Sequence, residues 1–354
     1  MVTRKQAQDA YDAGRPIMSD AEFDARFNEN SGYLGKGGKV IHSVPMLSQQ
    51  KCHSFEDVEK FIGKMSKAGE QNIWASLKLD GFACSLLYRN GELVMASTRG
   101  DGESGEDITD AVKMYVDKKY IPRSLKDFIG SVLYGVKINE TDIEVRGEVV
   151  LPISQATEND TNYRNVATGL CKRKELKPSE YSLAFFAYDL LGGGYDNEPD
   201  NIKLSSLLAL GFHVVPYKSF GSYISGPSLN QIFGIMEDLR DTFDVLCDGI
   251  VFKCNSKITK LRLGATDHHP KYSIAYKFPT NEYETQVISV EITIGKTGKQ
   301  TPVAHIKPVM IDGAVVRSVS LGSIDAMNKL DVVAGCMVMV TRSGGVIPKI
   351  TRRV

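Results

Sequence analysis

Residues 76–81, SLKLDG, place a lysine inside a segment that alternates like a β-strand. The leucines would point to one face of the strand, and Ser76, Lys78 and Asp80 would point to the other. A lone lysine on a strand is usually a solvated one. Whether Lys78 does chemistry therefore depends on which other residues the chain can bring to it.

Other polar residues stand inside or at the ends of apolar segments. TRGDGESGED contains Arg99, EVRGE contains Glu148, RNVATG contains Arg164, CDGIVFK contains Asp248 and Lys253, and AYKFP contains Lys277. An ordinary explanation exists for some of them, such as a cross-strand ion pair between Glu148 and Arg146. Lysines in strands as apolar as GIVFK and IAYKF, however, require a specific reason.

Together these residues suit one kind of chemistry, the attack of a nucleophile on a phosphoryl group. A lysine amine attacks only after it has lost its proton, and neighbouring cations favour that loss. The same cations would hold a phosphate and stabilise the charge that develops on it. Carboxylates such as Glu148 and Asp248 would hold a divalent metal ion or a ribose hydroxyl. The set predicts covalent attack by Lys78 on a phosphate.

The segments that must position these residues form an α+β pattern without regular βαβ repetition. ACSLLYRNGELVMASTRGDG predicts a hairpin with its turn at Asn90 and Gly91. Amphipathic spacing in SFEDVEKFIGKM and SLNQIFGIMEDLRD predicts helices. Further strands are predicted in DIEVRGEVVLP, YSLAFFAYDLL, CDGIVFK and SIAYKFP.

The two ends of the chain differ from this body. Residues 3–13 and SDAEFDARF predict short helices, the second with a capping box formed by Ser19 and Glu22. From about residue 285, short strands with glycine turns and a helical IDAMNKL predict a five-stranded barrel of the OB type. We therefore expect a helical region at 1–40, a mixed domain at 41–282 and a barrel at 283–354.

Composition narrows the class of protein. The six cysteines, at 52, 84, 171, 247, 254 and 336, form no CxxC pair, so no zinc site is expected. Scattered cysteines of this kind are typical of proteins in a reducing compartment. No apolar run is long enough to span a bilayer, and the first residues have no apolar signal region. We expect a cytoplasmic protein with no membrane partner.

Charge is distributed unevenly although its sum is zero. Residues 285–354 contain nine Lys and Arg against four Asp and Glu, a net of +5, which leaves −5 for the remainder. A basic module beside an acidic body suits contact with a phosphate backbone. A chance asymmetry explains a difference of this size equally well.

The order of the motifs resembles that of the NAD-dependent, bacterial-type DNA ligases, from about residue 9 to the end. The motifs are KLDG, TRGDGESGED, EVRGEV, RNVATGL, FFAYDLL, CDGIVFK, AYKFP, GKTGKQTPVA and RSGGVIPKI. The resemblance implies a nucleotidyltransferase (ATP-grasp-like DNA ligase adenylation) domain that forms lysyl-AMP. It also implies a short helical region before that domain and an OB-fold barrel after it. The implied reaction is the sealing of nicks in duplex DNA, with NAD+ as adenylate donor and Mg2+ as metal.

The resemblance also assigns roles to particular residues. Lys78 would be the adenylated nucleophile, with Asp80 and Asp248 in the catalytic set, and Glu148 and Asp248 would hold Mg2+. The adenylate would be contacted by Ser76, Arg99, Glu148 at the ribose, Tyr188 stacked on adenine, and Lys253 and Lys277 at base and phosphate. The nicotinamide half of NAD+ would be held by Asp20, Phe23 and Asp24 of RPIMSDAEFD, with Ser48 and Gln49 of HSVPMLSQ near the dinucleotide.

Contacts with nicked DNA are implied or expected for a set of basic residues. They are Arg164, Lys172, Arg240, Lys296, Arg342 and Lys349. For each of the last three, a solvated basic face is at least as good an explanation. Lys172 stands where the family has arginine, which would remove bidentate phosphate geometry.

Three further departures from the family affect the expectations. Ser76 replaces a glutamate that reads the adenine amino group, and a hydroxyl carries no charge. The N-terminal helical region is short. The zinc finger, helix-hairpin-helix and BRCT domains of longer relatives are not present, so the chain is a minimal ligase, a fragment, or one subunit of a ligase split over two chains. A virus or phage would suit such a compact enzyme.

Two other functions are compatible with the same residues. One is an ATP- or GTP-using RNA ligase or capping-type nucleotidyltransferase, against which the RPIMSDAEFD segment argues. The other is a nick-binding subunit that has lost adenylation, which Ser76 and the short N-terminal region would suit. Labelling by NAD+, by ATP or by neither distinguishes the three.

Overall fold

A computed structural model of the chain describes residues 39–70, 72–139, 142–157, 160, 162–173, 175–220, 228–266, 269–278, 282–294, 300–311, 314–343 and 347–354. Most of the helical region predicted for residues 1–40, namely residues 1–38 with Asp20, Phe23 and Asp24, lies outside the described residues. Lys296 lies outside them as well.

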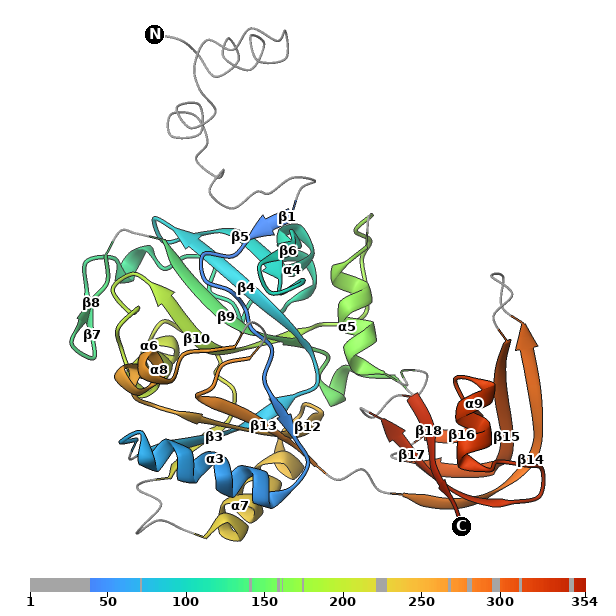
Figure 1. Cartoon of the computed structure of the whole chain (residues 1–354). Helices are drawn as coiled ribbons and strands as arrows, with labels where there is room; N and C mark the ends of the chain where they lie inside the picture. Colours follow the sequence, from blue (N-terminus) through green and yellow to red (C-terminus); the bar gives the residue numbers. More distant parts are fainter. Residues whose placement is uncertain are drawn as a thin grey trace, which may run out of the picture.

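The body consists of two sheets, one of four strands and one of five (Figure 1). The four-stranded sheet has the order β10 (Ala184–Gly192), β9 (Ile143–Val150), β4 (Phe82–Arg89) and β5 (Glu92–Thr98), all antiparallel. The five-stranded sheet has the order β11 (Tyr217–Phe220), β3 (Ile73–Leu79), β12 (Cys247–Cys254), β13 (Ser273–Lys277) and β2 (Lys51–Cys52), in which only β2 is parallel to its neighbour.

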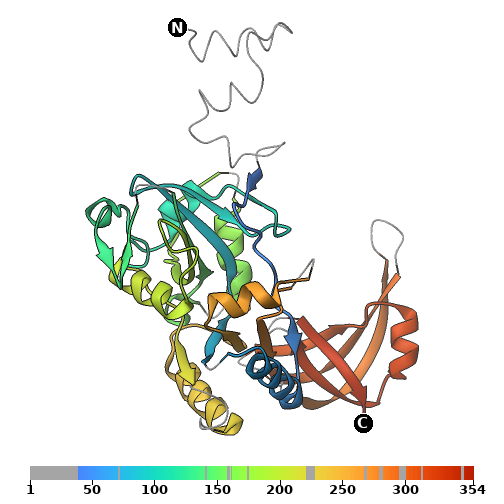
Figure 2. The same cartoon turned by 60° about the vertical axis from the view of Figure 1, so that its left-hand side comes forward.

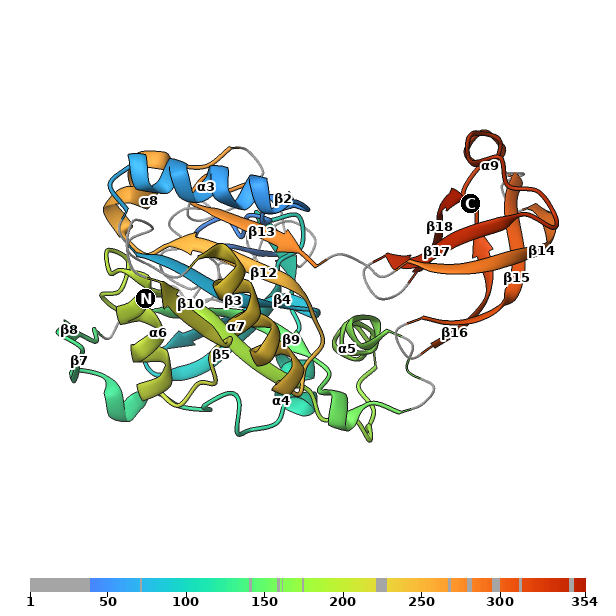
Figure 3. The same ribbon diagram turned by 90° about the horizontal axis from the view of Figure 1, so that it is seen from below.

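Two amphipathic helices cover one face of the five-stranded sheet (Figures 1 and 3). Helix α3 (Phe55–Lys67) begins where the Ser54 side chain accepts a hydrogen bond from the amide of Asp57. Helix α7 (Leu229–Thr242) begins at a complete capping box between Ser228 and Gln231. Both helices were expected from the spacing of their apolar residues, and the prediction is confirmed.

Shorter helices, which were not among the predicted ones, complete the body. They are α4 (Thr109–Tyr115), α5 (Tyr163–Cys171), α6 (Asp200–Ala209) and α8 (Lys257–Leu263), with 3-10 turns at Lys126–Phe128 and Ile153–Gln155. Small strand pairs join β1 (Lys39–Ile41) to β6 (Ser104–Glu106) and β7 (Val132–Leu133) to β8 (Val136–Lys137). None of the helices in the described part of the chain has the length and apolar character that a bilayer-spanning helix requires.

The predicted hairpin is confirmed in β4 and β5. Asn90 and Gly91 connect the strands with φ angles of 49° and 77°. Both values lie in the left-handed region, which a two-residue turn of type I′ requires and which asparagine and glycine adopt most readily. The turn places Arg99, at the far end of β5, beside Ala83 at the start of β4, where the Arg99 amide donates to the Ala83 carbonyl at 3.1 Å.

The two sheets share a core at the point where the chain crosses from β3 to β4. Val150 and Phe186 of the four-stranded sheet pack in one cluster with Leu77 and Leu79 of the five-stranded sheet. Gly81 makes the crossing, and a Cβ atom there would lie 2.3 Å from the carbonyl oxygen of Val149. Only glycine permits this approach, which brings the end of β3 against the end of β9.

The C-terminal region forms a separate curved sheet with its own core (Figure 2). Its order is β16 (Ala314–Ser320), β15 (Gln300–Ile311), β14 (Tyr283–Ile294), β17 (Met337–Ser343) and β18 (Ile347–Arg353), with helix α9 (Ile324–Leu330) between β16 and β17 in the chain. The five strands and the IDAMNKL helix were expected and are confirmed. The domain boundaries at 40, 282 and 283 stay predictions.

Candidate active site

The residues around Lys78 are brought together by strand register. Gly249 of β12 pairs with Lys78 of β3 on one side and with Lys277 of β13 on the other. Residues directly opposite one another in adjacent strands share a face of the sheet. The two lysines therefore lie in one row across three strands, although they are distant in the sequence.

A local irregularity in β12 places a carboxylate between the two lysines. The pairing of β12 with β3 shifts between Cys247 and Gly249, so Asp248 is an extra residue of the kind found in a β-bulge. Lys78 Nζ donates to Asp248 Oδ1 at 2.6 Å, and Lys277 Nζ lies 2.9 Å from Oδ2. Burial acts to raise the pKa of Asp248, but the two lysines outweigh it and the pKa is lowered.

Two further carboxylates act on the same centre. Burial and the charge of Asp248 raise the pKa of Asp80, whose Oδ1 lies 3.9 Å from a guanidinium nitrogen of Arg164. Burial raises the pKa of Glu148 on β9 to about 7, even though Lys78 and Arg164 act to lower it. Burial disfavours the anionic form of such carboxylates, and a cation bound beside them stabilises that form.

The available oxygen atoms fit a divalent cation that is shared with a substrate. Asp248, predicted as a Mg2+ ligand together with Glu148, contacts ammonium groups through both of its oxygens, and its metal role stays a prediction. The other carboxylates of the site are Asp80 and Glu148. Within the described ranges, no group of three or more His, Cys, Asp or Glu side chains is arranged to hold a metal ion alone. Mg2+ typically binds one or two carboxylates together with substrate phosphates, and this set suits that arrangement.

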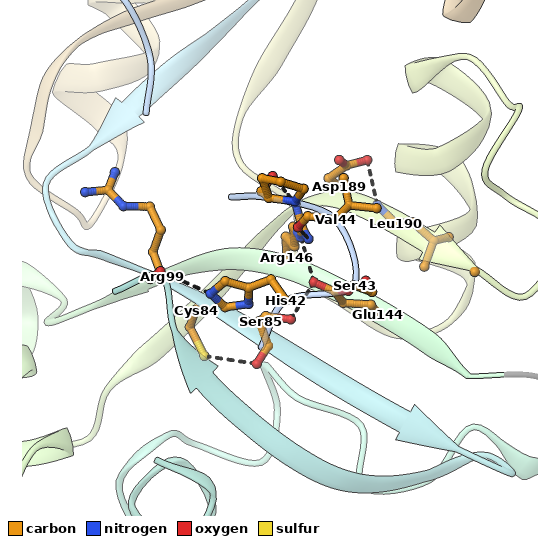
Figure 4. A network of polar contacts seen from close by, with 12 residues as sticks. His42, Ser43, Val44, Cys84, Ser85, Arg99, Glu144, Arg146, Asp189 and Leu190 are labelled. Carbon is orange, nitrogen blue, oxygen red and sulfur yellow. Dashed lines mark hydrogen bonds and ion pairs between the residues drawn. The ribbon is translucent and has the colours of Figure 1, made fainter. Parts of the chain in front are cut away.

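Arg99 enters the site region through its backbone. The ring Nε2 of His42 lies 3.0 Å from the carbonyl oxygen of Arg99, and Figure 4 shows the Arg99 guanidinium extending away from His42. Burial lowers the pKa of His42, which favours the neutral ring. A neutral ring that donates from Nε2 fixes the end of β5 from which Arg99 projects.

A buried ion pair holds the segment that follows β1 on the four-stranded sheet (Figure 4). Arg146 Nε donates to Glu144 Oε1 at 2.7 Å, and the same guanidinium donates to the carbonyl oxygens of Val44 and Pro45. Arg146 thus pairs with Glu144 rather than with Glu148, so the ordinary explanation for Glu148 is wrong. Glu148 lies on the same face of β9 as Glu144 and Arg146 but is not the partner of Arg146.

Two of the predicted adenylate contacts, Ser76 and Lys253, lie on the same strands as Lys78 and Gly249, whereas Tyr188 lies on the four-stranded sheet. Ser76 stands opposite Val251 and Tyr217, on the same face of β3 as Lys78. Tyr188 is half-buried on β10, and burial raises the pKa of its hydroxyl. Lys253 lies on the same face of β12 and forms an ion pair at 2.9 Å with Asp200, the first residue of α6.

Ser48 and Gln49 contact protein rather than open space. Ser48 Oγ lies 3.0 Å from Nδ1 of His269, and Gln49 Oε1 accepts a hydrogen bond from the hydroxyl of Ser273 on β13. Both residues precede β2, which pairs with β13. Their predicted place near a dinucleotide stays a prediction.

The candidate DNA contacts are spread over both parts of the protein. Arg164 on α5 is exposed and is the one beside the carboxylates of the site. Lys172 forms an ion pair with Glu106 at 2.8 Å, and Arg240 lies over the ring of Phe278 at 4.8 Å. Lys349 is exposed on β18, and Arg342 belongs to β17.

Sequence reasoning missed Asp200, which contacts both Lys253 and Lys260. An acidic residue in the first turn of a helix is favoured there by the helix dipole, so it carries no signal of a partner on another element. Only the fold places the start of α6 against β12. No pattern in the sequence would have indicated this contact.

Comparisons with known proteins give the family context. Residues 36–281 match the family model of the NAD-dependent DNA ligase adenylation domain, and residues 284–354 match that of the NAD-dependent DNA ligase OB-fold domain. A DNA ligase of Wolbachia pipientis subsp. Culex pipiens is 33% identical over 97% of this chain and 54% of its own length. A DNA ligase of Borreliella burgdorferi (strain ZS7) is 34% identical over 90% of this chain and 48% of its own length. The chain spans about half the length of these curated relatives.

Among solved structures, the one titled Pmar-Lig_PreS3 aligns with a TM-score of 0.48 and 13% identity, over 99% of this chain and 72% of that chain. A likeness of this strength supports no inference about the site.

Proposed function

Because the chain belongs to the family of NAD-dependent DNA ligases, we propose that it seals nicks in duplex DNA with NAD+ as the adenylate donor. The observation that supports this most directly is the row of Lys78 and Lys277 on either side of Asp248, at 2.6 and 2.9 Å. A nucleophile, a second cation and an orienting carboxylate are the groups that transfer of a nucleotidyl group requires.

In the proposed first step, Lys78 Nζ attacks the phosphorus of the adenylate half of NAD+. A nitrogen–phosphorus bond forms, the bond to the leaving oxygen breaks, and nicotinamide mononucleotide leaves with that electron pair. The Lys78 amine must give up a proton, and Asp248 Oδ1 is within hydrogen-bond distance of it. Lys277 is placed to stabilise the negative charge of the phosphate during the transfer.

Two further transfers complete the proposed cycle. The 5′-phosphate of the nick attacks the phosphorus of lysyl-AMP, which returns the electron pair to Lys78 and leaves AMP on the DNA. The 3′-hydroxyl then attacks the 5′-phosphate, loses its proton and expels AMP. Arg164 is exposed beside Asp80, where it can meet the phosphate of the nick.

We assign Mg2+ to Asp80 and Glu148, because both are carboxylates whose pKa values are raised and whose charge Lys78 and Arg164 balance only in part. When bound, Mg2+ would neutralise phosphate charge. The other roles in the transfer belong to residues of the chain. Asp248 orients the nucleophile, and Lys277 and Arg164 bind phosphate oxygens.

The simplest test of the proposal is to measure which nucleotide, NAD+ or ATP, labels the protein covalently. Wild-type protein incubated with NAD+ labelled in its adenine should acquire one covalent label per chain, and labelled ATP should give none. Nicked duplex DNA added afterwards should lose its nick as the label is released as AMP. Labelling by ATP instead of NAD+, or no labelling by either, would overturn the proposed reaction.

DNA contacts in the proposal come from Arg164, Lys172 and Arg240 of the body and from Lys349 of the barrel. Each of these cations that meets a phosphate releases counterions, so the affinity for a nick should fall steeply with salt. A second chain that supplies further DNA-binding domains stays a prediction.

Glu148 should make the Mg2+ requirement depend on pH. Its pKa of about 7, against an ordinary value of 4.5, means that the side chain is largely protonated at pH 6 and largely anionic at pH 8. A cation binds the anionic form. As the pH rises toward 7, the Mg2+ concentration for half-maximal lysyl-AMP formation should therefore fall by up to about tenfold per pH unit. Mg2+ titrations at pH 6, 7 and 8 measure this.

The matched variants are Glu148→Gln and Glu92→Gln. Glutamine at 148 should raise the Mg2+ requirement and remove its dependence on pH, whereas Glu92 lies on the surface in an ion pair with Lys126 and should behave as wild type. A wild-type Mg2+ requirement that stays constant from pH 6 to 8 would contradict the assignment.

The raised pKa of Glu148 also affects folding stability. Between pH 4.5 and 7 the folded protein keeps a proton on Glu148 that the unfolded chain has lost, so the contribution of Glu148 to stability falls as pH rises through this range.

A further inference from the structure

A second set of charges lies where β10, α6 and α8 meet the end of β12, away from the row of Lys78. It comprises Asp189, Asp200, Lys203, Lys253 and Lys260, called here the charge cluster. Asp200 contacts Lys253 at 2.9 Å and also contacts Lys260, and Asp189 contacts Lys203 at 2.9 Å. The cluster thus contains three cations and two carboxylates.

Asp200 is fixed by more than its lysines. Its side chain retains 5% of its exposure, and its amide donates to the carbonyl of Asn255. The following amide, of Asn201, donates to the side chain of Asn255 at 2.9 Å. Burial acts to raise the pKa of Asp200, but Lys253 and Lys260 outweigh it, so the carboxylate stays charged. The position of the carboxylate therefore dictates the position of the ammonium groups that it contacts.

Lys253 is the cation of the charge cluster that lies on the same face of the five-stranded sheet as Lys78. Gly249, Val251 and Lys253 alternate on one face of β12, opposite Lys78, Ser76 and Trp74 of β3 respectively. Gly249 and Lys253 are four residues apart, about 13 Å along a strand. That spacing suits a nucleotide whose phosphate lies at Lys78 and whose base lies toward Lys253.

Two stacked aromatic rings lie beside Lys253. Trp74, opposite Lys253, stacks on Tyr217 with ring centroids 4.6 Å apart. Trp74 is 5% exposed, and its Nε1 has no hydrogen-bond partner among the described residues. Ser76, between the rows of Lys78 and Lys253, adds a hydroxyl but no charge.

We propose that Asp200 is a positioning residue that holds Lys253 as the hydrogen-bond donor by which this site selects adenine. The inference rests on the proposed function, in which an adenylate is the group transferred. An ammonium group donates only. The N1 atom of adenine accepts a hydrogen bond, whereas the N1 atom of hypoxanthine carries a proton and donates. A fixed ammonium group therefore favours adenine without the carboxylate that Ser76 replaces.

The affinities for AMP and IMP, measured by calorimetry, test the proposal independently of NAD+ chemistry. Wild type should bind AMP at least about tenfold more tightly than IMP, because a site that donates to N1 leaves its donor unpaired with hypoxanthine. Asp200→Asn should reduce that preference to about threefold or less. A ratio of two affinities measured on one preparation does not depend on the fraction of protein that is folded.

Asp189→Asn is the matched control, because it removes the other carboxylate of the charge cluster, which is 33% exposed, and leaves the contact of Asp200 with Lys253. It should keep the wild-type preference for AMP. A preference unchanged by Asp200→Asn, or lost equally in both variants, would overturn the inference.

Labelling by NAD+, measured in parallel, keeps this result apart from the proposed function. Wild type that labels, with a preference unaffected by Asp200→Asn, rejects only the role of Asp200. Wild type that does not label rejects the ligase reaction, while the AMP and IMP affinities still decide whether Asp200 sets base selection. In labelling kinetics, Asp200→Asn should raise KM for NAD+ about tenfold with little change in kcat, the pattern of lost uniform binding.

Discussion

Replacement of Lys78 by alanine is expected to abolish the covalent adduct with AMP. Alanine has no atom that can form the nitrogen–phosphorus bond, and no other lysine replaces it, because Lys277 lies on the far side of Asp248. Single-turnover labelling with adenine-labelled NAD+ should fall by at least about three orders of magnitude. Lys78→Arg keeps a cation and should fail equally, since a guanidinium does not lose its proton at neutral pH.

A pre-adenylated nick separates the nucleophile from the rest of the site. In the last step of the proposed cycle, the 3′-hydroxyl attacks a phosphate that already bears AMP, and Lys78 forms no bond. Lys78→Ala should therefore retain much more sealing of that substrate than of an ordinary nick. Equal loss on both substrates would assign Lys78 a structural role instead.

The matched control for charge is Lys60→Ala. Lys60 is an exposed lysine of α3 in an ion pair with Glu56 at 2.9 Å. Its removal should leave labelling at the wild-type rate. Persistence of the adduct in Lys78→Ala, located by peptide mapping at another lysine, would overturn the assignment of the nucleophile.

Replacement of Asp248 by asparagine is expected to have the second largest effect. The change keeps the shape of the side chain and removes the negative charge that both Lys78 and Lys277 contact. The two ammonium groups would then face each other without an anion, and the nucleophile would lose its orientation. We expect the single-turnover rate of adduct formation to fall by about two orders of magnitude or more.

Stability should change less than the rate. Breaking a fully buried ion pair costs about 3–5 kcal/mol. Lys78 and Lys277 retain 20% and 23% of their side-chain exposure, so water screens the unpaired charges and we expect about 1–2 kcal/mol in urea unfolding. Asp142→Asn, which removes a similarly exposed carboxylate from its pair with Arg89, is the control and should leave the rate unchanged.

A double variant tests whether the three groups act together. If Asp248 serves Lys277 as well as Lys78, the effects of Asp248→Asn and Lys277→Met on adduct formation should not add. Additive losses, or a rate in Asp248→Asn within threefold of wild type, would contradict the role given to the carboxylate.

The family and much of the fold could be predicted from local sequence. Alternation in SLKLDG placed Lys78 on the polar face of a strand, and Asn90 and Gly91 fixed a hairpin through their access to positive φ. Apolar spacing located α3 and α7, and glycine-separated strands located the barrel. These features depend on residues close together in the chain, so a sequence pattern carries them.

Short elements and the partners of charged residues could not be predicted in this way. Helix α6 packs through tertiary contacts rather than through a strong amphipathic pattern of its own. Sequence reasoning offered Arg146 as a partner for Glu148, whereas the fold pairs Arg146 with Glu144 and leaves Glu148 with a pKa near 7.

By itself, the sequence determined which residue types are available for phosphoryl chemistry and that Lys78 stands among them. The tertiary structure decided which carboxylate meets which lysine. Asp248 meets Lys78 across 170 residues because of an irregularity in β12, and Asp200 meets Lys253 because α6 begins beside that strand. The energy of such contacts depends on burial and strand register, which arise only when distant segments pack.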